Sequence, residues 1–334
     1  MKTCIKILLA TCILFNTSVA LAQDLHFSQF FQSPMLRNPA LAGLFEGDVR
    51  VQGVYRDQWN SVTTGYRTAS MSGEYKTPIG NGDDFVTMGM QFFYDKAGTV
   101  SYTNTQILPA LNYHKSLSTD KSKYLSLGFM GGWVQHSIDL SKITTNSQYE
   151  GMGIGENISD PTYSYLDGSV GMSFNSALNN NTDNNYYIGA AYHHFNRPKA
   201  SFYQNKDIEL NPKWVFSGGL KLAVTDYAYI TIQGDYSRQG SFRETVFGAM
   251  YGFTFGDFPD EPDYAIHFGT YIRWNDALIP VVKLDYNPFS VSFSYDANIS
   301  KLKPSSYGRG GFEISLSWIT KLPNRSNPYI NPKF

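Results

Sequence analysis

The chain has 334 residues, a net charge of −1 and 16% charged residues, well below the roughly 25% of soluble globular proteins. The balanced charge excludes the basic surface of a nucleic-acid-binding protein, so no nucleic-acid partner is expected. Both cysteines, Cys4 and Cys12, fall within the first 22 residues. The rest of the chain therefore offers no disulfide, thiol nucleophile or cysteine-ligated metal.

Residues 1–22 have the pattern of a secretory signal peptide. Two lysines precede an apolar run, and Ala20 and Ala22 frame a small-x-small cleavage site. We expect cleavage before Gln23 and export from the cytoplasm. A lipoprotein signal with Cys12 as the acylated residue is the alternative, and the threonine that precedes this cysteine disfavours it.

Residues 23–47 follow the signal and are too apolar for a free tail. Burying each large apolar side chain is worth roughly 1.5–3 kcal/mol. We therefore expect this segment to fold into or against the following domain as a plug or lid. A helix lying on a membrane interface is the alternative. The large apolar side chains are Phe27, Phe30, Phe31, Met35, Leu36, Leu41 and Leu44.

From residue 48 to 320 the sequence repeats about ten residues of alternating character followed by a turn-forming cluster. Alternation with a period of two is the pattern of a strand with one apolar face. The expected strands are 49–57, 66–76, 85–94, 102–114, 123–135, 164–175, 186–195, 213–224, 227–237, 241–255, 264–274, 277–287, 289–297 and 311–319.

Fourteen such segments in succession predict a transmembrane barrel. After the signal, no stretch of about 18 apolar residues offers a spanning helix. Few charges, 16% aromatic residues and an even strand number are typical of outer-membrane barrels. A sheet in lipid must also close, because an open edge would leave backbone groups unpaired. The predicted fold is all-β: an outer-membrane β-barrel of about 14 antiparallel strands, spanning 48–320 and surrounded by outer-membrane lipid.

The connections alternate in length. If both chain ends are periplasmic, the longest connections, 136–163, 196–212 and 298–310, are extracellular, and most of the others are tight turns. An asparagine-rich link at 175–185 is expected to be flexible, and 321–334 is expected to be a periplasmic tail. The long connections contain aromatic residues of the kind enriched at protein interfaces. The candidate partner-facing residues are Tyr149, Phe202, Tyr203 and Tyr307.

Strand parity predicts balanced charges in the lumen, and buried charges persist when they are paired. Five bases and five acids point inward, so we expect internal ion pairs rather than the single-sign lining of a selective pore. The candidate lumen network is Arg56, Gln58, Asp296 and Glu313. The other inward charges are Arg50, Lys221, Arg273, Lys283, Glu74, Asp235 and Asp285.

No motif indicates an enzyme or a cofactor. HExxH, GxSxG and P-loop patterns do not occur in the sequence. His193 and His194 are expected on one strand, where neighbours point to opposite faces and cannot share a metal. We therefore predict no catalytic, cofactor-binding or metal-ligating residue. A serine and histidine paired on the lipid-facing side would instead favour an integral-membrane hydrolase.

Several motifs resemble those of the PorP/SprF family. The segment FSQFFQSPMLRNPALAGL, with Asn38, Pro39 and Gly43, resembles the family's N-terminal signature. YRDQW, YDANISKL, FEISLSW and a C-terminal Pro-x-Phe follow in the expected order, although Asn331 stands where many members have cysteine. The resemblance implies an outer-membrane barrel of the type IX secretion and gliding-motility machinery. Some members belong to the core apparatus, and others serve one large secreted surface protein.

The resemblance and the barrel pattern together predict the function. We expect a component or accessory of type IX secretion that supports export or surface retention of a large, adhesin-like protein. The expected partners are that secreted protein, which carries a C-terminal sorting domain, and other components of the machinery. A diffusion channel for small solutes is the alternative, which a wide and uncharged lumen would favour.

Overall fold

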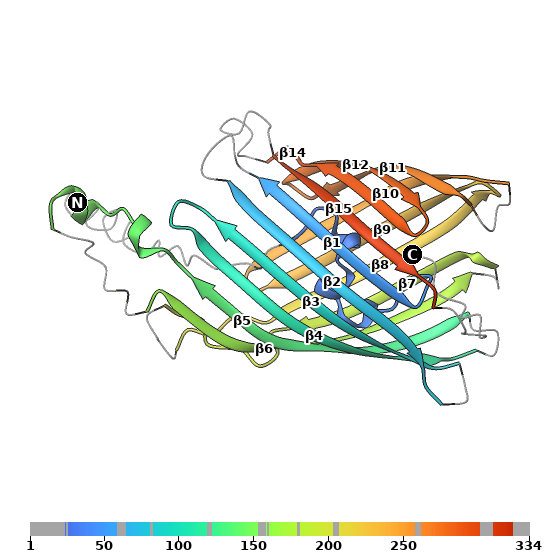
Figure 1. Ribbon diagram of the computed structural model, residues 1–334, viewed down its shortest axis with the longest axis horizontal. Coiled ribbons are helices and arrows are strands. Elements are labelled where there is room, and N and C mark those ends of the chain that lie inside the picture. The colour runs from blue at the N-terminus through green and yellow to red at the C-terminus, as the bar shows by residue number, and fades with distance from the viewer. Residues whose placement is uncertain are drawn as a thin grey trace, which may run out of the picture.

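The alternating segments form one antiparallel sheet that closes on itself (Figure 1). β1 pairs with β2 on one side and with β15, the last strand, on the other. This computed structural model describes residues 24, 26–58, 65–80, 83–118, 122–152, 158, 160–178, 181–202, 207–257, 262–300 and 310–322. Among the helices in these ranges, none is long and apolar enough to cross a membrane. The expected signal peptide lies outside the described residues.

Every segment predicted from the alternation lies on a strand of the sheet. The strands are β1 Val49–Gln58, β2 Tyr66–Pro78, β3 Phe85–Ala97, β4 Tyr102–Ser116, β5 Lys123–Ser137, β6 Thr162–Leu178, β7 Asn181–His193, β8 Lys213–Thr225, β9 Ala228–Gln239, β10 Phe242–Phe255, β11 Tyr264–Arg273, β12 Ala277–Tyr286, β13 Phe289–Tyr295, β14 Ala297–Asn298 and β15 Gly311–Thr320. Short helices accompany them: η1 Phe30–Gln32, α2 Pro34–Arg37, η2 Pro39–Leu41, η3 Leu140–Lys142 and α3 Asn146–Tyr149.

β14 continues β13, which brings the barrel to the predicted fourteen strands. Ser294 of β13 pairs with Val281, and Ala297 of β14 pairs with Leu278 in the same register on β12. In that register Pro280 faces the residue before Asp296. Because proline has no N–H to donate to the ladder, the pairing is interrupted there. β13 and β14 therefore act as one interrupted strand of the barrel.

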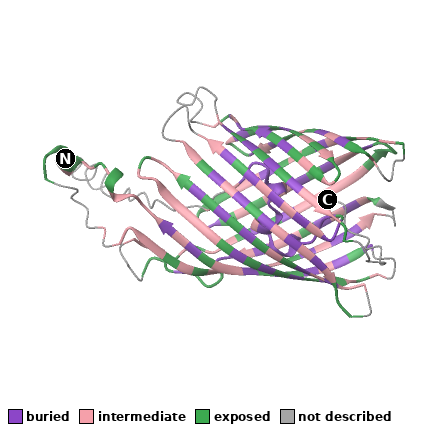
Figure 2. Cartoon of the chain, viewed as in Figure 1, coloured by how far each residue is buried: buried purple, intermediate pink, exposed green. Residues whose placement is uncertain are grey.

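The barrel has its polar side chains inside and its apolar side chains outside. Buried and exposed residues alternate along the strands (Figure 2). On β3, Met88 and Phe92 are 48% and 45% exposed, whereas Gln91 is fully buried. On β15, Leu316 is 54% exposed and Glu313 is fully buried. This inverted distribution suits a wall with lipid outside and a packed polar interior.

Two expectations about the region around β7 are wrong. The asparagine-rich segment at 175–185 is not a flexible link, since β6 and β7 extend through most of it. His193 and His194 do not point to opposite faces. β7 ends at His193, and His194 adopts a left-handed backbone with φ 55°. The alternation therefore stops, and both side chains are buried, with ring centroids 6.3 Å apart.

The segment that precedes β1 runs lengthwise through the lumen. Asp24 contacts Gln239 at the end of β9, on the rim that carries the long connections. Asp48 contacts Thr320 at the end of β15, on the opposite rim of short turns. We call these the long-loop rim and the short-turn rim, and residues 24–47 the plug. Both chain ends were expected on one side of the membrane, but Asp24 and Thr320 lie at opposite rims.

Lumen-facing glycines make room for the centre of the plug. A Cβ added at Gly128 of β5 would overlap the backbone of Pro39 and Ala40. One at Gly171 of β6 would overlap the side chain of Asn38. The plug backbone thus packs directly on the wall, where any larger residue would push it away. These glycines are needed for close approach rather than for a special backbone conformation.

We expect Gly128→Ala to lower the free energy of unfolding by about 1–3 kcal/mol, because overpacking forces the plug off its seat. Gly73→Ala is the matched control. Gly73 lies on β2, and nothing is within 4 Å of its added Cβ, so its effect should stay within about 0.5 kcal/mol. Urea unfolding in lipid vesicles measures both. Equal effects of the two substitutions would contradict the direct packing of the plug on β5.

Candidate functional site

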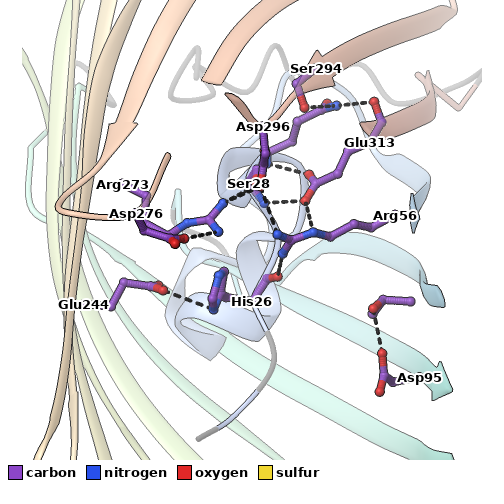
Figure 3. Close-up of polar contacts among 12 residues, drawn as sticks. His26, Ser28, Arg56, Asp95, Glu244, Arg273, Asp276, Ser294, Asp296 and Glu313 are labelled. Carbon is purple, nitrogen blue, oxygen red and sulfur yellow. Dashed lines mark hydrogen bonds and ion pairs between the residues drawn. The ribbon is translucent and has the colours of Figure 1, made fainter. Parts of the chain in front are cut away.

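Arg56 is the centre of the predicted lumen network (Figure 3). It points inward from β1 because its parity is opposite to that of the lipid-facing Tyr55. Its guanidinium lies 2.9 Å from Asp296 and 3.3 Å from Glu313. The three side chains are at most 6% exposed. The network therefore joins β1, β15 and the break between β13 and β14.

The carboxylates of this network also bind the plug. Glu313 accepts hydrogen bonds from the backbone N–H groups of Ser28, at 2.5 Å, and Gln29, at 2.7 Å. The Ser28 hydroxyl donates to Asp296 at 2.7 Å. The Gln29 amide donates to the Ser294 hydroxyl at 3.1 Å and to the Glu313 carbonyl at 3.0 Å. Two buried acids thus fix the backbone and side chains of a segment more than 260 residues away in the chain.

A second arginine completes the cluster. Arg273 of β11 donates to Asp296 at 2.8 Å, to Asp276 at 3.0 Å and to the Ser28 hydroxyl. Next to it, His26 of the plug lies 3.1 Å from Glu244 of β10. Parity correctly placed Arg273 in the lumen. The contributions of His26 and Glu244 were missed, because parity says nothing about how the plug lies inside the barrel.

A cavity of about 190 Å³ opens beside this network at the long-loop rim. Gln58, the fourth predicted member, lines this cavity at the end of β1. It lies next to the network rather than within it. The other lining residues include Asp24, His26, Arg56, Arg273, Asp276 and Asp296.

Asp24 anchors the first described part of the plug to the same rim. His194 lies between two carboxylates, 2.8 Å from Asp24 and 2.7 Å from Asp167. Burial alone would lower the pKa of His194, but these carboxylates outweigh it and raise the pKa to about 10. Burial likewise opposes ionisation of Asp24, but His194 and Lys213 hold its pKa well below the usual value. Both groups are therefore charged at neutral pH, and the anchor is an ion pair.

The other charges predicted to point inward also have partners, though not always on the wall and not always of opposite charge. Arg50 lies 2.6 Å from Glu74, and Lys283 and His267 lie 2.9 Å and 2.8 Å from Asp285. The Lys221 ammonium lies 4.0 Å from the centre of the Tyr229 ring. Asp235 instead accepts a 2.6 Å hydrogen bond from Arg37 of the plug. The sequence did contain a clue to the Arg37–Asp235 pair, because Arg37 is a charged residue within a largely apolar segment and must find a partner when that segment is buried.

The motif residues of the plug occupy its tightest contacts. The Asn38 amide donates to the carbonyls of Met172 and Ala190, at 3.1 and 3.3 Å, and Asn38 caps η2, which begins at Pro39. Gly43 has φ 84°, a conformation that favours glycine. Its N–H donates to Glu74 at 2.8 Å. Asn38, Pro39 and Gly43 therefore determine how the plug fits the wall.

The predicted partner-facing aromatics differ in position. Tyr149 of α3 is 95% exposed on the β5–β6 connection. Phe202 packs edge-on against Tyr163 of β6, with ring centroids 4.6 Å apart. Tyr203 and Tyr307 lie outside the described residues. Tyr149 is thus available to a partner as it stands, whereas Phe202 is used at least in part to hold its own connection.

Serine and histidine do meet in the lumen, but not in a hydrolase arrangement. Ser126 lies 2.7 Å from His114, and Ser169 lies 2.9 Å from His193. The second ring nitrogen contacts Thr87 in one case and a backbone carbonyl in the other. These pairs are buried and face away from lipid. In the part of the chain that the structure describes, no group of three or more His, Asp or Glu side chains could hold a metal.

We expect Arg56→Ala to lower the free energy of unfolding by about 3–5 kcal/mol, because it leaves the buried Glu313 without its paired cation and Asp296 with Arg273 alone. Arg67→Ala is the matched control on β2. Arg67 is 65% exposed and lies 3.7 Å from Asp57, so its loss should cost at most about 1 kcal/mol. Urea unfolding compares the two. A small effect at Arg56 would mean that water, and not Arg56, neutralises the site.

The comparisons with known proteins agree with this barrel. Its fold resembles the toluene transporter TbuX of Ralstonia pickettii, with 9% identity, a TM-score of 0.50 and coverage of 86% of this chain and 92% of that one. A mutant of the monoaromatic hydrocarbon channel TodX has 9% sequence identity and a TM-score of 0.51. The match covers 87% of this chain and 94% of that one. Such low identities show the fold alone, that of an outer-membrane β-barrel. Among curated proteins, none matches this chain.

Family membership follows from the sequence match over most of the chain. The model of the type IX secretion system membrane protein PorP/SprF matches residues 19–318. That range includes the plug, its Asn38-Pro39 motif and nearly all of the barrel. The chain belongs to the PorP/SprF family of type IX secretion system membrane proteins.

Proposed function

We propose that this barrel is a plugged outer-membrane scaffold that supports export or surface retention of a large secreted protein and is not itself the conduit. The plug carries the proposal. It contacts walls on opposite sides of the lumen, through Asn38 on β6 and β7, Phe30 beside Tyr271 of β11, and Glu313 of β15. A folded or extended substrate would have to displace these contacts to pass.

Because the plug fills the lumen, the secreted partner binds at the ends of the barrel in this proposal. The β5–β6 connection offers Tyr149 and Met152, which are 95% and 70% exposed, and exposed aromatic residues are frequent at interface centres. In this proposal the long-loop rim faces outward and residues 321–334 face the periplasm. Signal cleavage before Gln23 is part of the same proposal, since it leaves Asp24 next to the new terminus at the long-loop rim.

The diffusion-channel alternative makes an opposite electrical prediction. In planar bilayers we expect the intact barrel to be silent, because the plug blocks the lumen. Deletion of residues 23–47 should produce open, ohmic conductance in barrels that still assemble. Heat-modifiable migration on a gel confirms assembly of both proteins. Conductance of the intact protein equal to that of the deletion variant would favour the diffusion channel.

A loop deletion tests where the secreted protein docks. Removing residues 147–161 should release the partner from the cell surface while the barrel still assembles, because residues 148–152, which the structure describes, are exposed. Surface labelling of the partner and heat-modifiable migration of the barrel are measured together. Arg56→Ala is the contrasting variant and should reduce both. Normal display after the loop deletion would direct attention to the short turns and residues 321–334.

A further inference from the structure

The plug has two halves that are held in different ways. We call residues 26–32 the outer half and residues 35–45 the inner half. The inner half is wedged: Met35 and Ala40 are fully buried, and the Pro39–Ala40 backbone packs directly on Gly128. The outer half is held mainly by hydrogen bonds, and by the contact of His26 with Glu244, near the long-loop rim (Figure 3). Water or another peptide can replace such contacts. The inner half is packed so tightly that it can leave only if the barrel wall moves.

Several contacts to the outer half involve groups that every peptide has. Glu313 accepts two consecutive backbone N–H groups, those of Ser28 and Gln29. Arg56 donates to the backbone carbonyl of His26. These wall residues are buried and fixed by the Arg56–Glu313 and Arg56–Asp296 ion pairs. The wall therefore presents a built site for a main chain that bends at Ser28 and Gln29 and enters the single turn of η1, with an acceptor pair and a donor at set positions.

Side chains add sequence selectivity to this main-chain site. Phe27 packs with Val54 and stacks edge-on with Phe93, ring centroids 6.1 Å apart. Phe30 stacks edge-on with Tyr271 at 5.3 Å. Between the two rings, the Ser28 hydroxyl reaches Asp296 and the Gln29 amide reaches Ser294. Four consecutive positions thus read aromatic, hydroxyl, amide, aromatic.

We propose that the lumen at the long-loop rim is a peptide-binding site which the outer half occupies in cis. Its ligand in trans is a peptide with the pattern aromatic-Ser-Gln-aromatic that adopts the same bent main chain. The 190 Å³ cavity beside His26 and Arg56 gives the rim-side approach. That such a peptide comes from the secreted protein rests on the proposed function, but the site itself does not.

The test weakens the internal ligand and supplies an external one. Gln29→Ala in the full-length chain removes two side-chain hydrogen bonds from the outer half and leaves Glu313 and Ser294 intact. A fluorescent peptide of residues 24–33, DLHFSQFFQS, is titrated and its anisotropy measured. We expect saturable binding about tenfold or more tighter than to the wild type, where the tethered segment competes at high effective concentration. A scrambled peptide should not bind, and Gln29→Ala combined with Glu313→Gln should lose binding.

A measurement on the wild type needs no substitution. Hydrogen–deuterium exchange should show residues 26–32 exchanging by local opening, about tenfold or more faster than residues 35–45. Equal protection of the two halves overturns the proposal, as does failure of an assembled Gln29→Ala barrel to bind the peptide, or equal binding of the scrambled peptide. Retention of the secreted protein does not enter either experiment, so a failure here is distinct from a failure of the proposed function.

Discussion

Closure of the sheet is the constraint on which the rest of this structure depends. In hydrocarbon, each backbone N–H and C=O must be paired within the protein, and only a closed barrel pairs them all with strands. Closure between β1 and β15 then sends every second side chain into an enclosed lumen. Buried charges there must find opposite charges. The polar interior of this barrel, and the need to fill it, both follow from pairing the backbone in lipid.

The plug satisfies charges that the wall alone leaves unpaired. Arg37 forms an ion pair with Asp235, and the His26 ring lies 3.1 Å from the Glu244 carboxyl. The backbone of Ser28 and Gln29 shares Glu313 with Arg56. Removing the plug would therefore break ion pairs and hydrogen bonds as well as expose apolar side chains. Because the lumen is complete only with the plug in place, we regard the plug as part of the fold rather than as an addition to it.

The barrel could be predicted because one physical signal repeats along the chain. Alternation gave the strands and placed Arg56, Asp296 and Glu313 in the lumen, since parity is a local property. The path of the plug could not be predicted, because non-local contacts such as Asn38 with Met172 leave no periodic pattern. The break at His194 was missed for a related reason: a single left-handed residue ends a strand without interrupting the apolar pattern.

The free energy needed to release the outer half of the plug is smaller than that needed to release the whole plug. The inner half buries Met35, Leu41, Leu44 and Phe45, so its release exposes side chains worth about 6–12 kcal/mol at 1.5–3 kcal/mol each. The outer half buries Phe27 and Phe30, worth about 3–6 kcal/mol on the same basis. Its hydrogen bonds can be exchanged for bonds to water at little net cost. Since every 1.4 kcal/mol is a tenfold change in population, the outer half opens far more often than the whole plug, which would leave a pocket at the long-loop rim with a closed base.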